Sequence, residues 1–159
     1  MAIRCLAKCL TILVLLTATG CGARLVRSQP MVTLWPPKPP IEKVVAFLEM
    51  YTCDFMAVVE TDDPTILVRY DTRKPPCMRG GASNGRISLM NPECDWDWEI
   101  IDGIALHELL HVLGHWHHDE DPRSVMAPTI GKNWEMDPED WQWVIDTYCK
   151  PAASTGGNQ

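Results

Sequence analysis

Apolar residues recur along the middle of the chain with spacings that predict one helix followed by two strands. Over residues 41–52 they return every three or four positions, with charged residues between them, which predicts an amphipathic helix. Residues 55–60 and 65–70 are rich in Val, Ile and aromatic residues, and an Asp-Asp-Pro sequence stands between them. These two runs predict strands joined by a turn.

The following segment combines glycine-rich sequence with one more apolar run. Gly-Gly at 80–81 and Asn-Gly at 84–85 bracket a connection that we expect to be flexible. Residues 86–90, Arg-Ile-Ser-Leu-Met, are followed by Asn-Pro. They predict a short strand.

Two further helices are expected after this strand. Acidic residues at 95–99 can cap and start a long helix with one apolar side. The last helix is expected to begin with Asp137 as N-cap and Pro138 at its first position, and to run to about Cys149.

All five histidines of the chain cluster in one stretch of the long helix and the turn after it. His107 and His111 lie one helical turn apart on the same face, so both imidazoles can reach one metal ion. Glu108 stands beside them, and a carboxylate there can accept a proton from a metal-bound water. Gly114 tolerates the left-handed conformation that ends a helix, so the chain can turn back and His117 can supply a third ligand.

Residues 107–117 match the pattern HExxHxxGxxH at every fixed position, and this pattern resembles the long zinc signature of metzincin peptidases. Residues 124–130, with Met126, resemble the Met-turn of the matrixin branch of that family. Matrixins also carry paired acids at the start of their last helix. Asp140 matches the second acid, and Glu139 stands where the family usually has Asp.

The resemblance implies an α+β, zincin-like metzincin fold. Its parts would be a small twisted mixed sheet, an N-terminal helix, a long active-site helix, a Met-turn and a C-terminal helix. The segment 85–90 takes the place of the antiparallel edge strand that binds the substrate backbone in metzincins. An inner strand without substrate contact is the alternative for this segment.

The same resemblance implies a zinc-dependent endopeptidase that hydrolyses peptide bonds in extracytoplasmic proteins or peptides. One catalytic Zn²⁺ would be held by His107, His111 and His117, with Glu108 as the general base. The alternative function is a non-catalytic, zinc-stabilised peptide-binding module, although a pure binder has no need of a base at Glu108. Hydrolysis of a non-peptide bond has no supporting feature in the sequence.

Two histidines remain after three are assigned to zinc. His118 would replace His117 if the turn were remodelled, but the spacing from Gly114 favours His117. We expect His115 to be a solvent-facing turn residue, with support of the transition state as the alternative. Calcium is unsupported, because the acids that could bind it match no known loop. Those acids are Asp95, Asp97, Asp119 and Asp121.

The first 20 residues predict a signal peptide, since Arg4 and Lys8 precede the apolar run 10–16 and small residues follow. That run is too short to span a bilayer. Cys21 comes next, and Ala-Thr-Gly-Cys resembles a bacterial lipobox, in which the cysteine is lipidated. The protein is therefore expected to be exported as a bacterial membrane-anchored lipoprotein, with secretion as the alternative.

The rest of the chain divides into three parts. Residues 21–40 are proline-rich and predict a tether, residues 41–150 predict one metzincin-like catalytic domain, and residues 151–159 predict a disordered tail. The formal net charge of −7 argues against a nucleic-acid partner. We expect a monomer that meets the membrane only through its lipid anchor and whose partner is a protein or peptide substrate.

Cysteines indicate an oxidising compartment. Two of the seven lie in the signal segment and Cys21 is the lipid candidate, so the domain keeps four, which predicts two disulfides. Of three connectivities we favour Cys53 with Cys149, joining the ends of the first and last helices, and Cys77 with Cys94. In another interpretation Cys77 ligates zinc, as the inhibitory cysteine of matrixin zymogens does.

Lipidation at Cys21 can be tested directly by substitution. Labelled fatty acid fed to the producing cells should enter the wild-type protein and not Cys21→Ser, because the thiol is the site of acylation. Gel fluorography of the purified protein measures the label. Equal absence of label from both proteins would make this a secreted protein.

Overall fold

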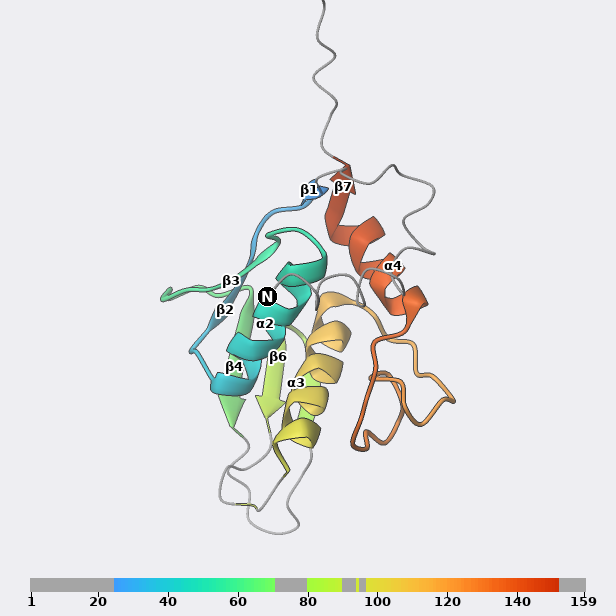
Figure 1. Cartoon of the computed structure of the whole chain (residues 1–159). Coiled ribbons are helices and arrows are strands. Elements are labelled where there is room, and N and C mark those ends of the chain that lie inside the picture. Colours follow the sequence, from blue (N-terminus) through green and yellow to red (C-terminus); the bar gives the residue numbers. More distant parts are fainter. Residues whose placement is uncertain (1–24, 71–79, 90–93, 95–96, 152–159) are drawn as a thin grey trace, which may run out of the picture.

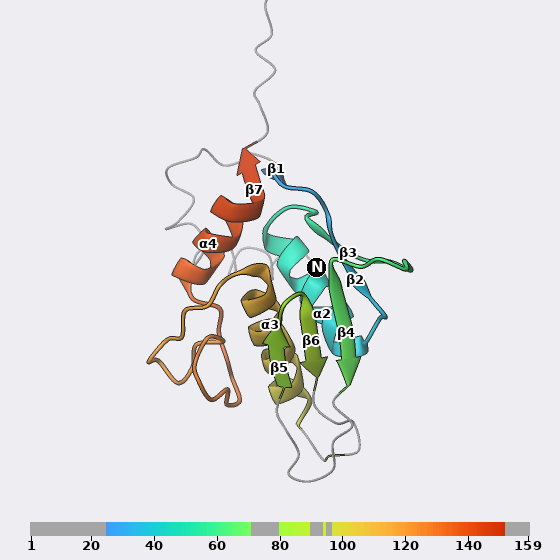
Figure 2. The ribbon, with the colours of Figure 1, turned by 180° about the vertical axis from the view of Figure 1, so that it is seen from behind.

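The computed structural model describes residues 25–70, 80–89, 94 and 97–151 of the chain (Figure 1). Helices α2 (Pro39–Tyr51) and α3 (Trp98–Leu113) cover one face of a sheet whose other face is seen in Figure 2. Helix α4 (Pro138–Tyr148) lies near the C-terminal end of α3, where the Tyr148 hydroxyl donates to the Leu113 carbonyl over 2.7 Å. The expected α+β class is confirmed.

The sheet has five strands in the order β3-β2-β4-β6-β5. Neighbouring strands are parallel except for β5, which is antiparallel to β6. The core between the sheet and the helices is apolar, and its largest fully buried members include Leu34, Leu48, Phe55, Leu106 and Leu109. In chain order the strands are β2 (Val32–Trp35), β3 (Met56–Val58), β4 (Ile66–Tyr70), β5 (Gly80–Ser83) and β6 (Arg86–Leu89).

The predicted tether is wrong over residues 25–40. Strand β2 is an inner strand of the sheet, and its alternate residues Val32 and Leu34 are buried in the core. The proline-rich part begins only after β2, where Pro39 and Pro40 occupy the first turn of α2, a position at which a missing N–H costs nothing. Burial of two alternate apolar side chains therefore makes this segment a strand despite the prolines that follow it.

The two ends of the domain are joined. Strand β1 (Leu25–Arg27) pairs antiparallel with β7 (Cys149–Pro151). The predicted disulfide between Cys53 and Cys149 is present, and it links the end of α2 to the end of α4. Beside it, Phe55 stacks on Tyr148 with ring centroids 4.6 Å apart.

The predicted edge strand is also wrong. Strand β6 lies inside the sheet between β4 and β5, which was the alternative, and β5 is the strand at that edge within the described residues. Asn-Gly at 84–85 forms a tight turn, with φ of 42° and 71°, that joins β5 to β6 as a hairpin. The segment expected to be a flexible connection therefore contributes a strand.

Several predictions fall outside the described residues: the signal peptide, Cys21, Asp95, Cys77 and the tail at 152–159. Cys94 is disulfide-bonded, while its pairing with Cys77 stays a prediction. None of the described helices combines the length and the apolar character needed to cross a membrane.

The bridge between Cys53 and Cys149 should dominate the stability of the domain. It closes a loop with a sequence separation of 96, which in the chain-entropy model adds about 4 to 5 kcal/mol to the free energy of unfolding. We expect Cys53→Ala/Cys149→Ala to lower the melting temperature by more than about 10 °C, as measured by calorimetry. The comparison variant Cys77→Ala/Cys94→Ala should lower it less, and the opposite ranking would contradict this role.

Candidate metal centre

Helix α3 carries the first two histidines because both of its ends are defined locally. At its start, the carboxylate of the N-cap Asp97 accepts a hydrogen bond from the Glu99 amide over 3.0 Å. At its end, Gly114 takes φ of 109°, a left-handed conformation in which residues with a side chain are strained. The predicted helix stop at Gly114 is therefore confirmed.

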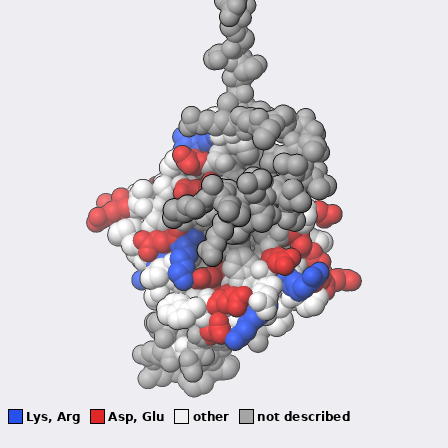
Figure 3. Space-filling view, viewed as in Figure 1, with Lys and Arg blue, Asp and Glu red and all other residues white. Residues whose placement is uncertain are grey.

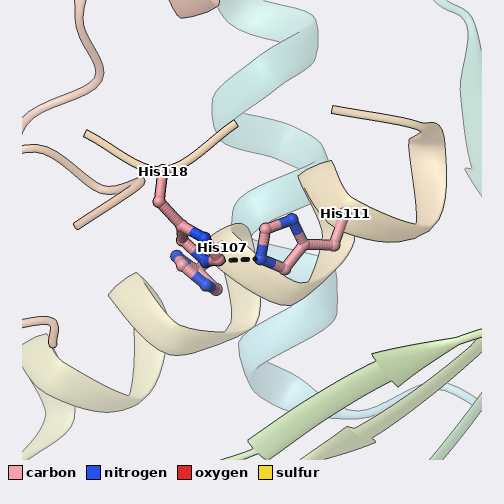
Figure 4. Close-up of side chains that lie close together, drawn as sticks. All are labelled: His107, His111 and His118. Atoms are coloured by element: carbon pink, nitrogen blue, oxygen red, sulfur yellow. Dashed lines mark hydrogen bonds between the residues drawn. The ribbon is translucent and has the colours of Figure 1, made fainter. Parts of the chain in front are cut away.

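Three histidines converge beside the C-terminal half of α3 (Figure 4). One ligand atom from each of His107, His111 and His118 lies within 4.8 Å of the others, and the group could hold a metal ion. Nε2 of His111 and Nε2 of His118 are 3.1 Å apart. Two imidazole nitrogens that share a tetrahedral zinc ion would be about 3.3 Å apart.

Backbone carbonyls fix which nitrogens of the two helical histidines face this point. Nδ1 of His107 donates to the Val125 carbonyl, and Nδ1 of His111 donates to the His115 carbonyl, each over 2.8 Å. A carbonyl oxygen only accepts, so the proton sits on Nδ1 and each Nε2 lone pair is left for a ligand. Burial lowers the pKa of His107 to about 4 and also lowers the pKa of His111, which keeps both rings in the neutral form that metals bind.

The structure brings His118, not His117, to His107 and His111, which corrects the spacing-based choice. His117 is exposed, and its ring lies toward His115 at a centroid distance of 6.4 Å. The turn after Gly114 is closed by the His115 amide, which donates to the Leu110 carbonyl. The number of residues after Gly114 does not by itself determine which side chain faces the helix. The backbone path of this turn does, and it directs His118 there.

The segment resembling a Met-turn lies beneath the histidines. Met126 is fully buried, and its amide donates to the Ser124 hydroxyl over 3.0 Å. Its carbonyl accepts from the Asp119 amide, the residue that follows His118. With the Val125 carbonyl on His107, this segment supports two members of the histidine cluster.

Glu108 lies between α3 and the edge strand β5. A Cβ at Gly80 would come within 3.3 Å of Glu108 Oε1 and 2.8 Å of Ile104 Cγ2, so only glycine lets the first residue of β5 approach α3 this closely. Burial raises the pKa of the Glu108 carboxyl to about 7. The carboxyl is thus held beside a sheet edge with a raised proton affinity.

His115 is not the solvent-facing turn residue expected from the sequence. Its side chain is 12% exposed, and Nε2 lies 2.7 Å from Oδ1 of Asp140, on α4. The neighbouring Trp116 is 62% exposed and stacks on the His111 ring, with centroids 5.3 Å apart. The sequence offered no signal for either contact, because the paired acids at the start of α4 do not reveal which residue they meet.

An open hollow of about 440 Å³ lies next to His118. It is lined by the loop after His118 and by the residues after Met126, among them Asp119, Ala127 and Thr129. Of the three clustered histidines, His118 is the one that lines this hollow.

Of the acids considered for calcium, the three that the structure describes do not form a comparable group. Asp97 pairs with Lys132, and Asp121 pairs with Arg123. Asp119 accepts from the Asp121 amide. Within the described residues, the three histidines are the only set of His, Cys, Asp or Glu side chains placed to share a metal ion.

The chain matches no protein-family model, and a comparison with curated proteins finds no match. The geometry of the site therefore supplies the argument for what it does.

Metal content should separate the two candidate third ligands. His118→Ala should lose most of the bound zinc, because it removes one of three converging nitrogens, whereas His117→Ala should retain it. Elemental analysis of both proteins, purified identically, gives the measurement. Loss of zinc from His117→Ala alone would restore the ligand chosen from the sequence.

Proposed function

We propose that this protein is a zinc-dependent endopeptidase that cleaves exported proteins or peptides. The observation that carries the proposal is the convergence of His107, His111 and His118. Glu108 follows His107 in the sequence, and its carboxyl lies against the edge of a sheet. This set supplies a metal site, a proton acceptor and a strand that can receive a peptide.

Zinc is the metal that suits the donor set best. Three imidazole ligands leave a fourth tetrahedral position open, as in catalytic zinc sites. The two hydrogen bonds from Nδ1 to backbone carbonyls orient the rings before any metal binds. A zinc ion bound there would polarise a carbonyl group and lower the pKa of a water molecule toward neutrality.

Glu108 is the residue that would move the proton. It follows the proposed ligand His107 on α3, and its carboxyl is partly buried between α3 and β5. In this role it accepts a proton from the attacking water and later delivers one to the leaving amine.

The edge strand β5 is the expected binding site for the substrate backbone. Within the described residues β5 pairs only with β6, so its outer edge can accept an extended peptide as an additional strand. Gly80 brings this strand against Glu108, which would set the peptide beside the proton acceptor. The hollow beside His118 offers room for one substrate side chain.

The arrangement also supports the proposed metzincin, matrixin-like assignment. A mixed sheet with an antiparallel edge strand, a helix with two histidines, a turn at Gly114 and a buried Met126 match what the resemblance implies. The departure is the third histidine, which falls one residue later than the pattern has it.

The remaining proposals concern location and partners. The disulfide between Cys53 and Cys149 suits an exported protein. This protein would be anchored through Cys21 or secreted, and it would act as a monomer. On the face shown in Figure 3, the described Lys and Arg side chains lie among Asp and Glu and do not gather into a basic patch. The charge distribution on this face offers no basic footprint for a nucleic-acid backbone.

Glu108→Gln tests the mechanism. It keeps the three histidines, so zinc content should match the wild type, while turnover should fall by about 10²- to 10⁴-fold because proton transfer is lost. Mass-spectrometric profiling of cleaved peptides, with and without a chelator, measures turnover and specificity together.

The matched control is Glu60→Gln, which removes the charge of an exposed glutamate on another part of the domain. It should cleave like the wild type. Full activity of Glu108→Gln would refute the assigned base. A wild type that binds zinc and peptide but cleaves nothing would leave the peptide-binding module as the function.

A further inference from the structure

His115 and Asp140 form a contact that the proposed peptidase chemistry does not use. Nε2 of His115 lies 2.7 Å from Oδ1 of Asp140, and their side chains are 12% and 6% exposed. The contact joins the turn after α3 to the first turn of α4. It therefore ties a separate helix to the loop that carries His118.

The backbone amide and carbonyl of His115 are both hydrogen-bonded to the helix that carries His107 and His111. Its carbonyl accepts from Nδ1 of His111 over 2.8 Å, and its amide donates to the Leu110 carbonyl over 2.9 Å. Its ring packs against Trp143 of α4 with centroids 4.5 Å apart. Because the carbonyl orients His111 and the chain reaches His118 three residues later, the position of His115 affects two of the three histidines.

Asp140 is an unusual choice for a merely structural contact. It is buried, and its Oδ2 has no hydrogen-bond partner among the described residues. Burying a carboxylate with one unpaired oxygen costs free energy that an exposed acid in the first turn of a helix would not. The neighbouring Glu139 is such an exposed acid.

We propose that Asp140 and His115 are positioning residues for the metal centre. Asp140 holds the His115 side chain, which keeps the His115 carbonyl aimed at Nδ1 of His111 and keeps the turn in the form that presents His118. This inference rests on the proposed metal centre but not on peptidase activity.

The test uses zinc affinity and the visible spectrum of the cobalt-substituted protein, since both report ligand geometry. Asp140→Ala should weaken zinc binding by about 10- to 100-fold, as loss of a group that orients a ligand does, and should change the cobalt absorption bands. His115→Phe should do the same, because it keeps a ring at the position that packs against Trp143 but removes the hydrogen bond to Asp140. Asp140→Asn, which retains an acceptor oxygen, should stay within a few-fold of the wild type.

Glu139→Ala is the matched control on the same turn of α4 and should leave both readouts unchanged. If Asp140→Ala does not fold, His115→Phe against Asp140→Asn decides the question. Wild-type zinc affinity and cobalt spectrum in His115→Phe would overturn the proposal, even if its metal-free form melted at a lower temperature. A wild type that binds zinc but cleaves nothing would count against the peptidase proposal alone.

Discussion

The candidate metal centre depends on two backbone carbonyls, each of which accepts a hydrogen bond from Nδ1 of an imidazole. Without the carbonyls of Val125 and His115, the rings of His107 and His111 could rotate and change tautomer on the surface of α3. Both acceptors come from segments that follow the helix. The chain after α3 therefore has to bring two carbonyls back to the histidines. The bridge between Cys53 and Cys149 fixes the end of the last helix, α4, to the end of α2.

Elements with a strong local signal could be predicted from the sequence. Helix α2 follows from the apolar period over residues 41–52, and the end of α3 from Gly114. The pairing of Cys53 with Cys149 followed from placing the ends of two predicted helices together. His107 and His111 were paired correctly because the geometry of a helix alone sets their separation.

What failed depended on contacts between distant segments. Whether a strand lies inside a sheet or at its edge depends on the strands that pair with it. Residues 86–90 could therefore be recognised as a strand but not as an inner one. Strand β2 was hidden by the prolines after it, because only pairing with β3 and β4 reveals its place. The third histidine is His118 and not His117, because contacts with distant residues set the path of the turn. These are the hydrogen bond from the Asp119 amide to the Met126 carbonyl and the contact of His115 with Asp140 of α4.

The first described strand begins at Leu25, close in sequence to Cys21, and this limits how far a lipid-anchored domain could stand from the membrane. Since Leu25 already pairs with Pro151, only three residues, 22–24, separate the first described strand from Cys21. Fully extended, the four steps from Cys21 to Leu25 span about 14 Å, which is shorter than helix α3, whose 16 residues extend over about 24 Å. A lipid on Cys21 would therefore hold the domain against the bilayer surface, so that access to β5 would depend on which side of the domain faces the lipid headgroups.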